Sequence, residues 1–136
     1  YGTTKKSVEE ARARGKNVIL DVDTIGAMKI RALCPDATLI YILPPSWDEL
    51  KSRLSSTGIY TEEEVNALME IAEEEISCAN SYDYILVNDT ISNTLSRFAQ
   101  IIHSNRYSRN CMKEFLDSYI DGEVKPHVQS YKEALL

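Results

Sequence analysis

The sequence predicts an α/β fold in which a parallel sheet lies between helices on both faces, as a three-layer structure. Short, nearly continuous apolar runs occur at residues 18–22, 37–43 and 82–87. Such runs are typical of strands that are covered on both faces. The segments between them have the apolar spacing of helices, and strands that alternate with helices form parallel sheets. Three strands are few for such a sheet, so we expect further strands to complete it.

Helices are expected before, between and after these strands. The first ends at Gly15, two begin at capping boxes that start with Ser46 and Thr61, and one is capped by residues 88–90. The predicted helices are residues 7–14, 24–33, 46 to about 55–58, 61–79, 90–103 and 111–120. In the helix from residue 90, the residues expected to face the core are Ile91, Leu95, Phe98, Ala99 and Ile102.

Composition indicates one globular domain and excludes several classes of partner. The chain has 136 residues, of which 43% are hydrophobic, and its net charge is −6. This charge makes nucleic acids and anionic membranes poor partners. No apolar stretch approaches the ~20 residues that span a bilayer. The three cysteines are far apart and odd in number, which argues against a disulfide framework and predicts a cytoplasmic protein. No cysteine or histidine cluster has metal-site spacing.

Two acids end the first predicted strand. Asp21 and Asp23 are two positions apart, so their side chains are expected on one face at the carboxyl end of the strand. Ligands of open α/β sheets bind at these strand ends, which indicates a nucleotide or metal site. The alternative is structural, because Asp23 can simply cap the helix that follows.

Six short motifs follow one another along the chain: Tyr1-Gly2-Thr3, Leu20-Asp21-Val22-Asp23 with Gly26, Ile42-Leu43-Pro44-Pro45-Ser46, Thr61-Glu62-Glu63-Glu64, Tyr82-Asp83-Tyr84 and Val87-Asn88-Asp89. In this order and spacing they resemble the motifs of guanylate kinases. The resemblance covers about residues 1–103 and implies a P-loop NTPase-like, guanylate-kinase-like α/β domain. Residues 104–136 lie outside the resemblance, and their amphipathic pattern predicts a helical C-terminal tail.

The resemblance implies transfer of the γ-phosphoryl group of ATP to GMP, with Mg²⁺. It assigns Tyr1 and Gly2 to the GMP phosphate, and Thr3 and Asp23 to guanine. A carboxylate suits guanine, because it accepts from the N1–H and amino groups that adenine does not offer there. Asp21 is implied near magnesium and the phosphates, as the catalytic residue. Asn88 is implied at the adenosine of ATP, and residues 47–79 correspond to the lid that closes over ATP.

The chain departs from the family pattern at two lid positions and at one position beside the acids. Thr57 and Leu68 stand where active relatives carry arginines that clamp the phosphoryl group, while the retained Arg53 matches a structural arginine. An arginine supplied to such a site can be worth ~10³-fold in rate, so the loss of both predicts a large decrease. Ile25 replaces the glutamine that usually follows the acids.

The family's phosphate loop, G-x-x-x-x-G-K-[ST], is expected upstream of Tyr1. The pair Gly15-Lys16 does not fit that motif, because it precedes a strand and lacks the first glycine and the final Ser or Thr. The chain is therefore expected to be incomplete at its N-terminus, and to be completed by the missing half or by another copy. Three hypotheses follow: a guanylate kinase, a guanylate-kinase-like module that binds GMP or a protein without catalysis, and an unrelated α/β domain with coincidental matches.

Overall fold

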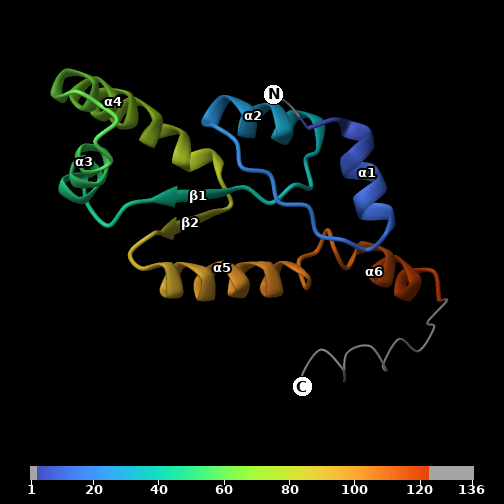
Figure 1. Ribbon diagram of the computed structural model, residues 1–136. Coiled ribbons are helices and arrows are strands. Elements are labelled where there is room, and N and C mark those ends of the chain that lie inside the picture. The colour runs from blue at the N-terminus through green and yellow to red at the C-terminus, as the bar shows by residue number, and fades with distance from the viewer. Residues whose placement is uncertain (1–2, 123–136) are drawn as a thin grey trace. The chain divides into compact units, whose positions relative to one another are not determined.

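The computed structural model describes residues 3–122, which form two compact units (Figure 1). The first unit ends at Pro35 and the second begins at Asp36. Both units are rich in helix, and the second contains a small parallel sheet. The helical segment suggested for the end of the tail falls largely at residues 123–136, outside the described residues.

The first unit contains helices α1 (Lys5–Ala13) and α2 (Thr24–Leu33), each started by a side-chain cap. The Thr4 hydroxyl accepts from the backbone N–H of Ser7 at 3.3 Å, so α1 begins two residues earlier than predicted. Helix α2 has the predicted bounds. Its Ala27 is buried, with 2% of its surface exposed, whereas Leu33 at its end is 85% exposed.

The predicted strand at residues 18–22 is wrong for this structure. These residues have no regular secondary structure, and 67% of Ile19 and 46% of Val22 are exposed. A strand forms only when its backbone groups are paired with another strand. Among the described residues, the two strands that form belong to the second unit and pair with each other. Residues 18–22 therefore have apolar strand character without the ladder that a strand needs.

The sheet of the second unit consists of β1 (Ile40–Leu43) and β2 (Tyr84–Val87). The strands are parallel, as predicted, with Ile40 opposite Tyr84 and Leu43 opposite Val87. Each strand is shorter than predicted, because just before the first paired residues a side chain takes the place of a backbone partner in the hydrogen-bond ladder. The Leu39 N–H donates to the carboxylate Oδ2 of Asp83 at 2.7 Å, where a backbone carbonyl would be needed to extend the sheet.

Helices α3 (Trp47–Ser56) and α4 (Glu62–Glu75) follow β1 and pack against each other, and α4 continues into the 3₁₀ helix η1 (Ile76–Ser81). The box at Thr61 is confirmed: its hydroxyl accepts from the Glu64 N–H at 3.3 Å, and the Glu64 carboxylate accepts from the Thr61 N–H at 2.8 Å. The box at Ser46 is only half formed. Ser46 accepts from the Glu49 N–H at 3.1 Å, but the Glu49 carboxylate pairs with Arg53 instead of reaching back.

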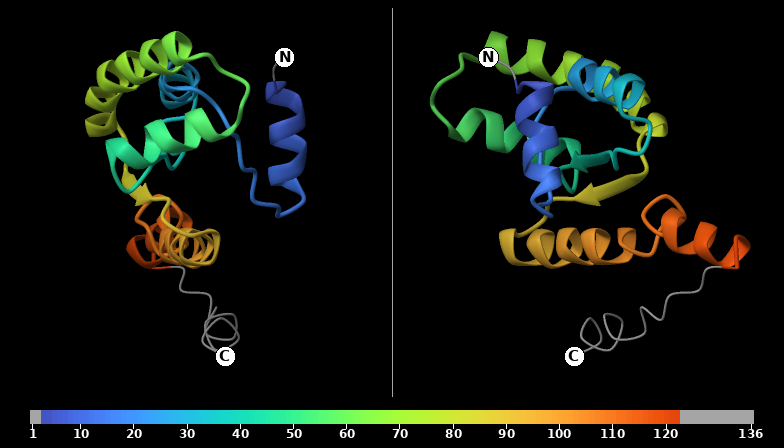
Figure 2. Two further views of the ribbon diagram at one scale, coloured as in Figure 1. Left: turned by 60° about the vertical axis from the view of Figure 1, so that its left-hand side comes forward. Right: turned by 90° about the vertical axis from the view of Figure 1, so that its right-hand side faces the viewer.

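Helices α5 (Ile91–Asn105) and α6 (Lys113–Ile120) complete the described chain, and α5 lies beside β2. In the views of Figure 2, α4 lies above and α5 below the two strands. The predicted inward face of α5 is only partly correct. Phe98 and Ile102 are partly buried, but Ile91 and Leu95 are 78% and 60% exposed. Two strands are too narrow to cover the whole apolar stripe of a 15-residue helix.

The core of the second unit is small and joins the sheet to its helices. Its buried apolar residues are Leu39, Val65, Ala79 and Leu86. Beside this core, the rings of Tyr41 and Tyr82 pack edge to face, with their centroids 4.9 Å apart. Burial, followed by the nearby charges of Glu75 and Cys78, raises the pKa of Tyr41. Residues 3–122 contain no helix long and apolar enough to cross a membrane.

Candidate functional site

In the first unit, Asp23 caps helix α2. Its Oδ1 accepts from the backbone N–H of Gly26 at 2.6 Å, and its backbone carbonyl accepts from Ala27 at 2.9 Å. Asp23 thus caps the helix that follows it, as the structural alternative predicted. One carboxylate oxygen is held by the helix, and because the whole side chain is exposed, Oδ2 remains available to a ligand.

Gly26 allows the Asp23 carboxylate to come this close. A Cβ at this position would lie 2.9 Å from Asp23 Oδ1 and 3.1 Å from the Cβ of Val22. Real Cβ atoms essentially never come within 3.0 Å of another atom, so a larger residue would displace the carboxylate. Glycine at position 26 of the sequence motif is therefore explained locally, because it leaves room for an acid to approach the N-terminus of the helix.

The other predicted residues of this unit are exposed or fall outside the described part of the chain. Thr3 precedes the cap of α1, and Asp21 lies in the irregular segment before α2; both are exposed. Tyr1 and Gly2 lie outside the described residues. Over residues 3–122, no three acidic, histidine or cysteine side chains are grouped so that they could hold a metal ion. Asp21, the carboxylate predicted near Mg²⁺, is thus not part of such a group; an ion carried mainly by nucleotide phosphates needs only one or two protein carboxylates.

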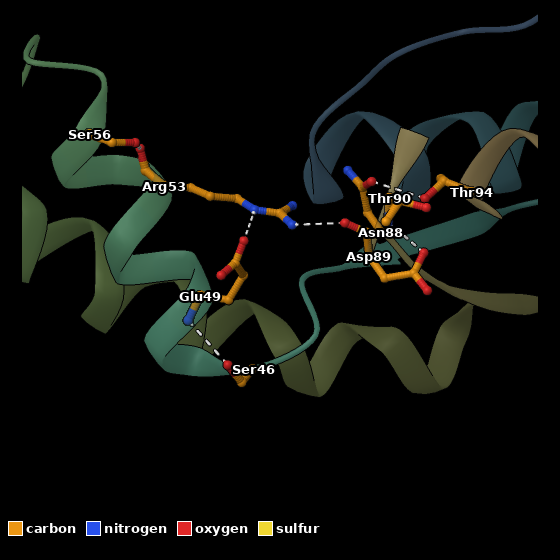
Figure 3. Close-up of polar contacts among 8 residues, drawn as sticks. All are labelled: Ser46, Glu49, Arg53, Ser56, Asn88, Asp89, Thr90 and Thr94. Atoms are coloured by element: carbon orange, nitrogen blue, oxygen red, sulfur yellow. Dashed lines mark hydrogen bonds and ion pairs between the residues drawn. The ribbon is translucent and has the colours of Figure 1, made fainter. Parts of the chain in front are cut away.

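In the second unit, Asn88 lies at the carboxyl end of β2, where the sheet opens into loops. Its backbone N–H donates to the carbonyl of Leu43 at 2.7 Å, which ties together the ends of the two strands. Its side-chain Oδ1 accepts from the hydroxyl of Thr94 on α5 at 3.0 Å (Figure 3). The side chain of Asn88 is therefore held at a strand end, the place where ligands of parallel sheets bind.

The neighbouring Asp89 is bound on several sides. Its Oδ1 accepts from the Thr90 N–H at 2.6 Å, and its Oδ2 accepts from Asn93 at 3.3 Å and pairs with Arg97 at 3.1 Å. The hydrogen bond from the Thr90 backbone, followed by those from Asn93 and Arg97, lowers the pKa of Asp89. Arg97 also donates to the carbonyl of Val87 at 3.2 Å, so the loop is held to the start of α5.

Arg53 connects α3 to this loop. Its Nε donates to the Glu49 carboxylate at 2.8 Å, and its Nη2 donates to the carbonyl of Asp89 at 3.4 Å (Figure 3). These two contacts use different nitrogens of one planar group, which a lysine could not do. The contacts support the structural role expected of Arg53.

Thr57 and Leu68, the two positions where the resemblance leads us to expect clamp arginines, have local roles here. Thr57 follows α3, where its hydroxyl donates to the Leu54 carbonyl at 2.8 Å and accepts from the Ile59 N–H at 3.2 Å. Leu68 is partly buried on α4. Neither side chain can provide a positive charge to a transferring phosphoryl group.

The sequence prediction included Asn88 but not Thr94, Asn93 and Arg97, which hold the loop around it. These residues lie within the first two turns of α5, and their hydrogen bonds depend on how that helix leaves β2. The available signal was weak: Thr94 is a polar residue beside the apolar Leu95, on the helix that follows the Asn88 motif.

Comparison with known proteins matches the sequence to one family. The family model described as guanylate kinase matches residues 1–105. The guanylate kinase of Clostridium acetobutylicum is 39% identical over 132 residues, which are 96% of this chain and 62% of that protein. The guanylate kinase of Francisella tularensis subsp. tularensis is 44% identical over 106 residues, which are 77% of this chain and 56% of that protein. A guanylate kinase of Thermus thermophilus is 38% identical over 117 residues, which are 86% of this chain and 53% of that protein.

The chain belongs to the guanylate kinase family. The resemblance inferred from the six motifs is thereby confirmed, and the hypothesis of coincidental matches is wrong. The chain spans between 53% and 62% of the length of the Thermus and Clostridium relatives.

Proposed function

We propose that this chain forms part of a guanylate kinase, which transfers the γ-phosphoryl group of ATP to GMP and yields ADP and GDP. The family match over residues 1–105 carries the proposal. The names of the relatives support it, since each of those compared is called a guanylate kinase.

The proposed GMP side lies in the first unit. Tyr1 and Gly2 would hold the phosphate of GMP, and Thr3 and Asp23 would contact guanine. The capped geometry of Asp23 supports this role, because Oδ1 is held by Gly26 and Oδ2 can accept from the N1–H and amino group of guanine. A bound and oriented carboxylate loses less freedom on binding the base than a free one.

The proposed ATP side includes Asn88, which would contact adenosine, and the lid of residues 47–79, which would close over ATP and exclude water. Asp21 would lie near the phosphates, as the catalytic residue, and would contribute one ligand or one hydrogen-bonded water to Mg²⁺. When bound, the ion neutralises charge that develops on the phosphates. The chain's own residues orient the two nucleotides.

We also propose the domain organisation behind this function. Residues 1–103 form the guanylate-kinase-like domain without its phosphate loop, and residues 104–136 form the helical tail. The complete domain is a three-layer P-loop NTPase-like structure whose remaining parts come from the missing N-terminal half or another copy of the chain. The exposed Ile19 and Val22 support this, because their run would find a strand partner in such a sheet. Free thiols at Cys34, Cys78 and Cys111 fit a location in the cytoplasm.

Thr57 and Leu68 favour a second candidate, a guanylate-kinase-like binding or scaffold domain with impaired catalysis. Phosphoryl transfer depends on positive charge at the transferring group, and neither residue supplies it. Replacing both by arginine in a form that also carries a phosphate loop should raise turnover. Arginine at two exposed lid positions outside the clamp, Lys51 and Ser52, provides the control. Unchanged turnover in the Thr57 and Leu68 variant would contradict the clamp argument.

The test of the proposed function is a calorimetric titration of this chain with GMP and, as the control ligand, AMP. Selective binding of GMP is expected, because the two nucleotides differ in the groups that Asp23 would contact. Equal binding of both, or binding of neither, would contradict guanine recognition by the first unit.

A further inference from the structure

The loop that follows β2 receives a contact from the first helix of the proposed lid. Arg53, on α3, donates through Nη2 to the backbone carbonyl of Asp89 at 3.4 Å (Figure 3). Its Nε donates to the Glu49 carboxylate at 2.8 Å, so the guanidinium group is also held by its own helix. Helix α3 therefore reaches the loop with a side chain that has already lost part of its rotamer freedom.

The same loop also holds the point where the lid leaves the sheet. The chain passes from Leu43, the last residue of β1, to Ser46, which caps α3. The backbone N–H of Asn88 donates to the Leu43 carbonyl at 2.7 Å. The loop thus holds α3 at two points, at its entry through Leu43 and along its length through Arg53.

Helix α5 holds this loop through Arg97, which lies in the second turn of the helix. Its Nη1 pairs with the Asp89 carboxylate at 3.1 Å and donates to the Val87 carbonyl at 3.2 Å. One nitrogen therefore joins the residue before Asn88 to the residue after it. The bonds from Thr90 and Asn93 to the same carboxylate do not reach back to Val87.

We propose that Arg97 is a positioning residue for the lid: by fixing residues 87–89, it keeps the Asp89 carbonyl where Arg53 reaches it. This rests on the proposed function, which assigns residues 47–79 to the lid. The coupling passes through a single residue, because α5 binds the carboxylate of Asp89 and α3 binds its carbonyl. A substitution on α5 should therefore loosen α3, although Arg97 lies outside the lid.

The test is amide hydrogen exchange in the 136-residue chain, followed by NMR, in α3 (residues 51–56) and in the second half of α5 (residues 99–105). Arg97→Met keeps an unbranched side chain but removes the charge and the donors. It should accelerate exchange in α3 by about 1.4- to 5-fold, the range that an exposed ion pair contributes to an equilibrium constant, and leave the second half of α5 unchanged.

Two further variants serve as controls. Arg97→Lys should exchange as the natural chain does, because both contacts of Arg97 use one nitrogen and an ammonium group can make them. Arg106→Met removes an exposed arginine at the other end of α5 and should leave exchange in α3 unchanged.

A double variant decides whether the effect passes through Arg53. If it does, Arg53→Met combined with Arg97→Met should accelerate exchange in α3 by less than the product of the two single effects. A full product would mean that the two arginines act independently, and it would overturn the inference. So would unchanged exchange in α3 of Arg97→Met, or an equal acceleration in α3 and α5, which would indicate a general loss of stability. The measurement needs no nucleotide, so the GMP titration decides the proposed function separately.

Discussion

Replacement of Asp23 by asparagine should separate the two roles of this residue. Oδ1 caps α2 through Gly26 at 2.6 Å, and Oδ2 is proposed to accept from guanine. Asparagine caps helices about as well as aspartate, so its Oδ1 can keep the bond to Gly26. The group that replaces Oδ2 is then an NH₂, which would face the N1–H and amino donors of guanine. The variant should fold like the natural chain but should bind GMP poorly.

The magnitudes of the two effects differ enough to be measured. Donors left unpaired on binding cost about 1–3 kcal/mol, which lowers GMP affinity by about 5- to 150-fold in Asp23→Asn. The free energy of unfolding should change by no more than a few tenths of a kcal/mol. Asp23→Ala, in contrast, loses the cap as well, at about 1 kcal/mol of stability.

The assays are urea unfolding followed by circular dichroism, and calorimetric titration with GMP and AMP. Asp23→Ser is the matched control for the cap, since serine caps well but has no second oxygen to offer guanine. GMP binding in Asp23→Asn as tight as in the natural chain would refute the role of Oδ2. Equal losses of GMP and AMP affinity would show that Asp23 does not discriminate between the bases.

Three further outcomes are expected. Gly26→Ala normally stabilises a helix by about 1 kcal/mol, but here the added Cβ would lie 2.9 Å from Asp23 Oδ1, so we expect no gain in urea unfolding and weaker GMP binding. Thr61→Ala should lower the free energy of unfolding by about 1 kcal/mol through loss of the box with Glu64, whereas Thr61→Ser should restore it; equal stability of both variants would contradict this. The pKa of Asp89 is lowered in the folded state, so its ionised carboxylate stabilises the fold fully above the ordinary Asp pKa, and this stabilisation is lost as the pH falls through the lowered pKa. Asp89→Asn should therefore flatten the acidic part of the curve of unfolding free energy against pH. A curve that is unchanged in the variant would rule this effect out.

Helix boundaries were the part of the fold most directly predictable from the sequence. The cap of α4 at Thr61 and the bounds of α2 follow from residues within one turn of each other, and the structure has both as predicted. The parallel pairing of β1 with β2 also followed, because strands joined through helices run in the same direction. Family membership came from motif order, which does not depend on how the chain folds.

Predictions failed where the outcome depends on distant partners. The run at residues 18–22 has the composition of a buried strand, yet it forms no ladder among the described residues, because pairing requires a neighbour that composition cannot supply. Ile91 is a similar case. The helical spacing of apolar residues predicts that Ile91 is buried, but it is exposed, because its burial depends on how wide a sheet lies against α5.

The candidate site shows the same division. The sequence by itself determined which residues we propose for the chemistry, namely the acids Asp21 and Asp23 and the amide of Asn88, because the order and spacing of motifs depend on the chain alone. Only the tertiary structure decided which atoms remain free to act. Gly26 occupies one oxygen of Asp23, and Thr94 occupies the carbonyl of Asn88. A hydrogen bond depends on distance and direction within a few tenths of an ångström, and only the packed chain sets these.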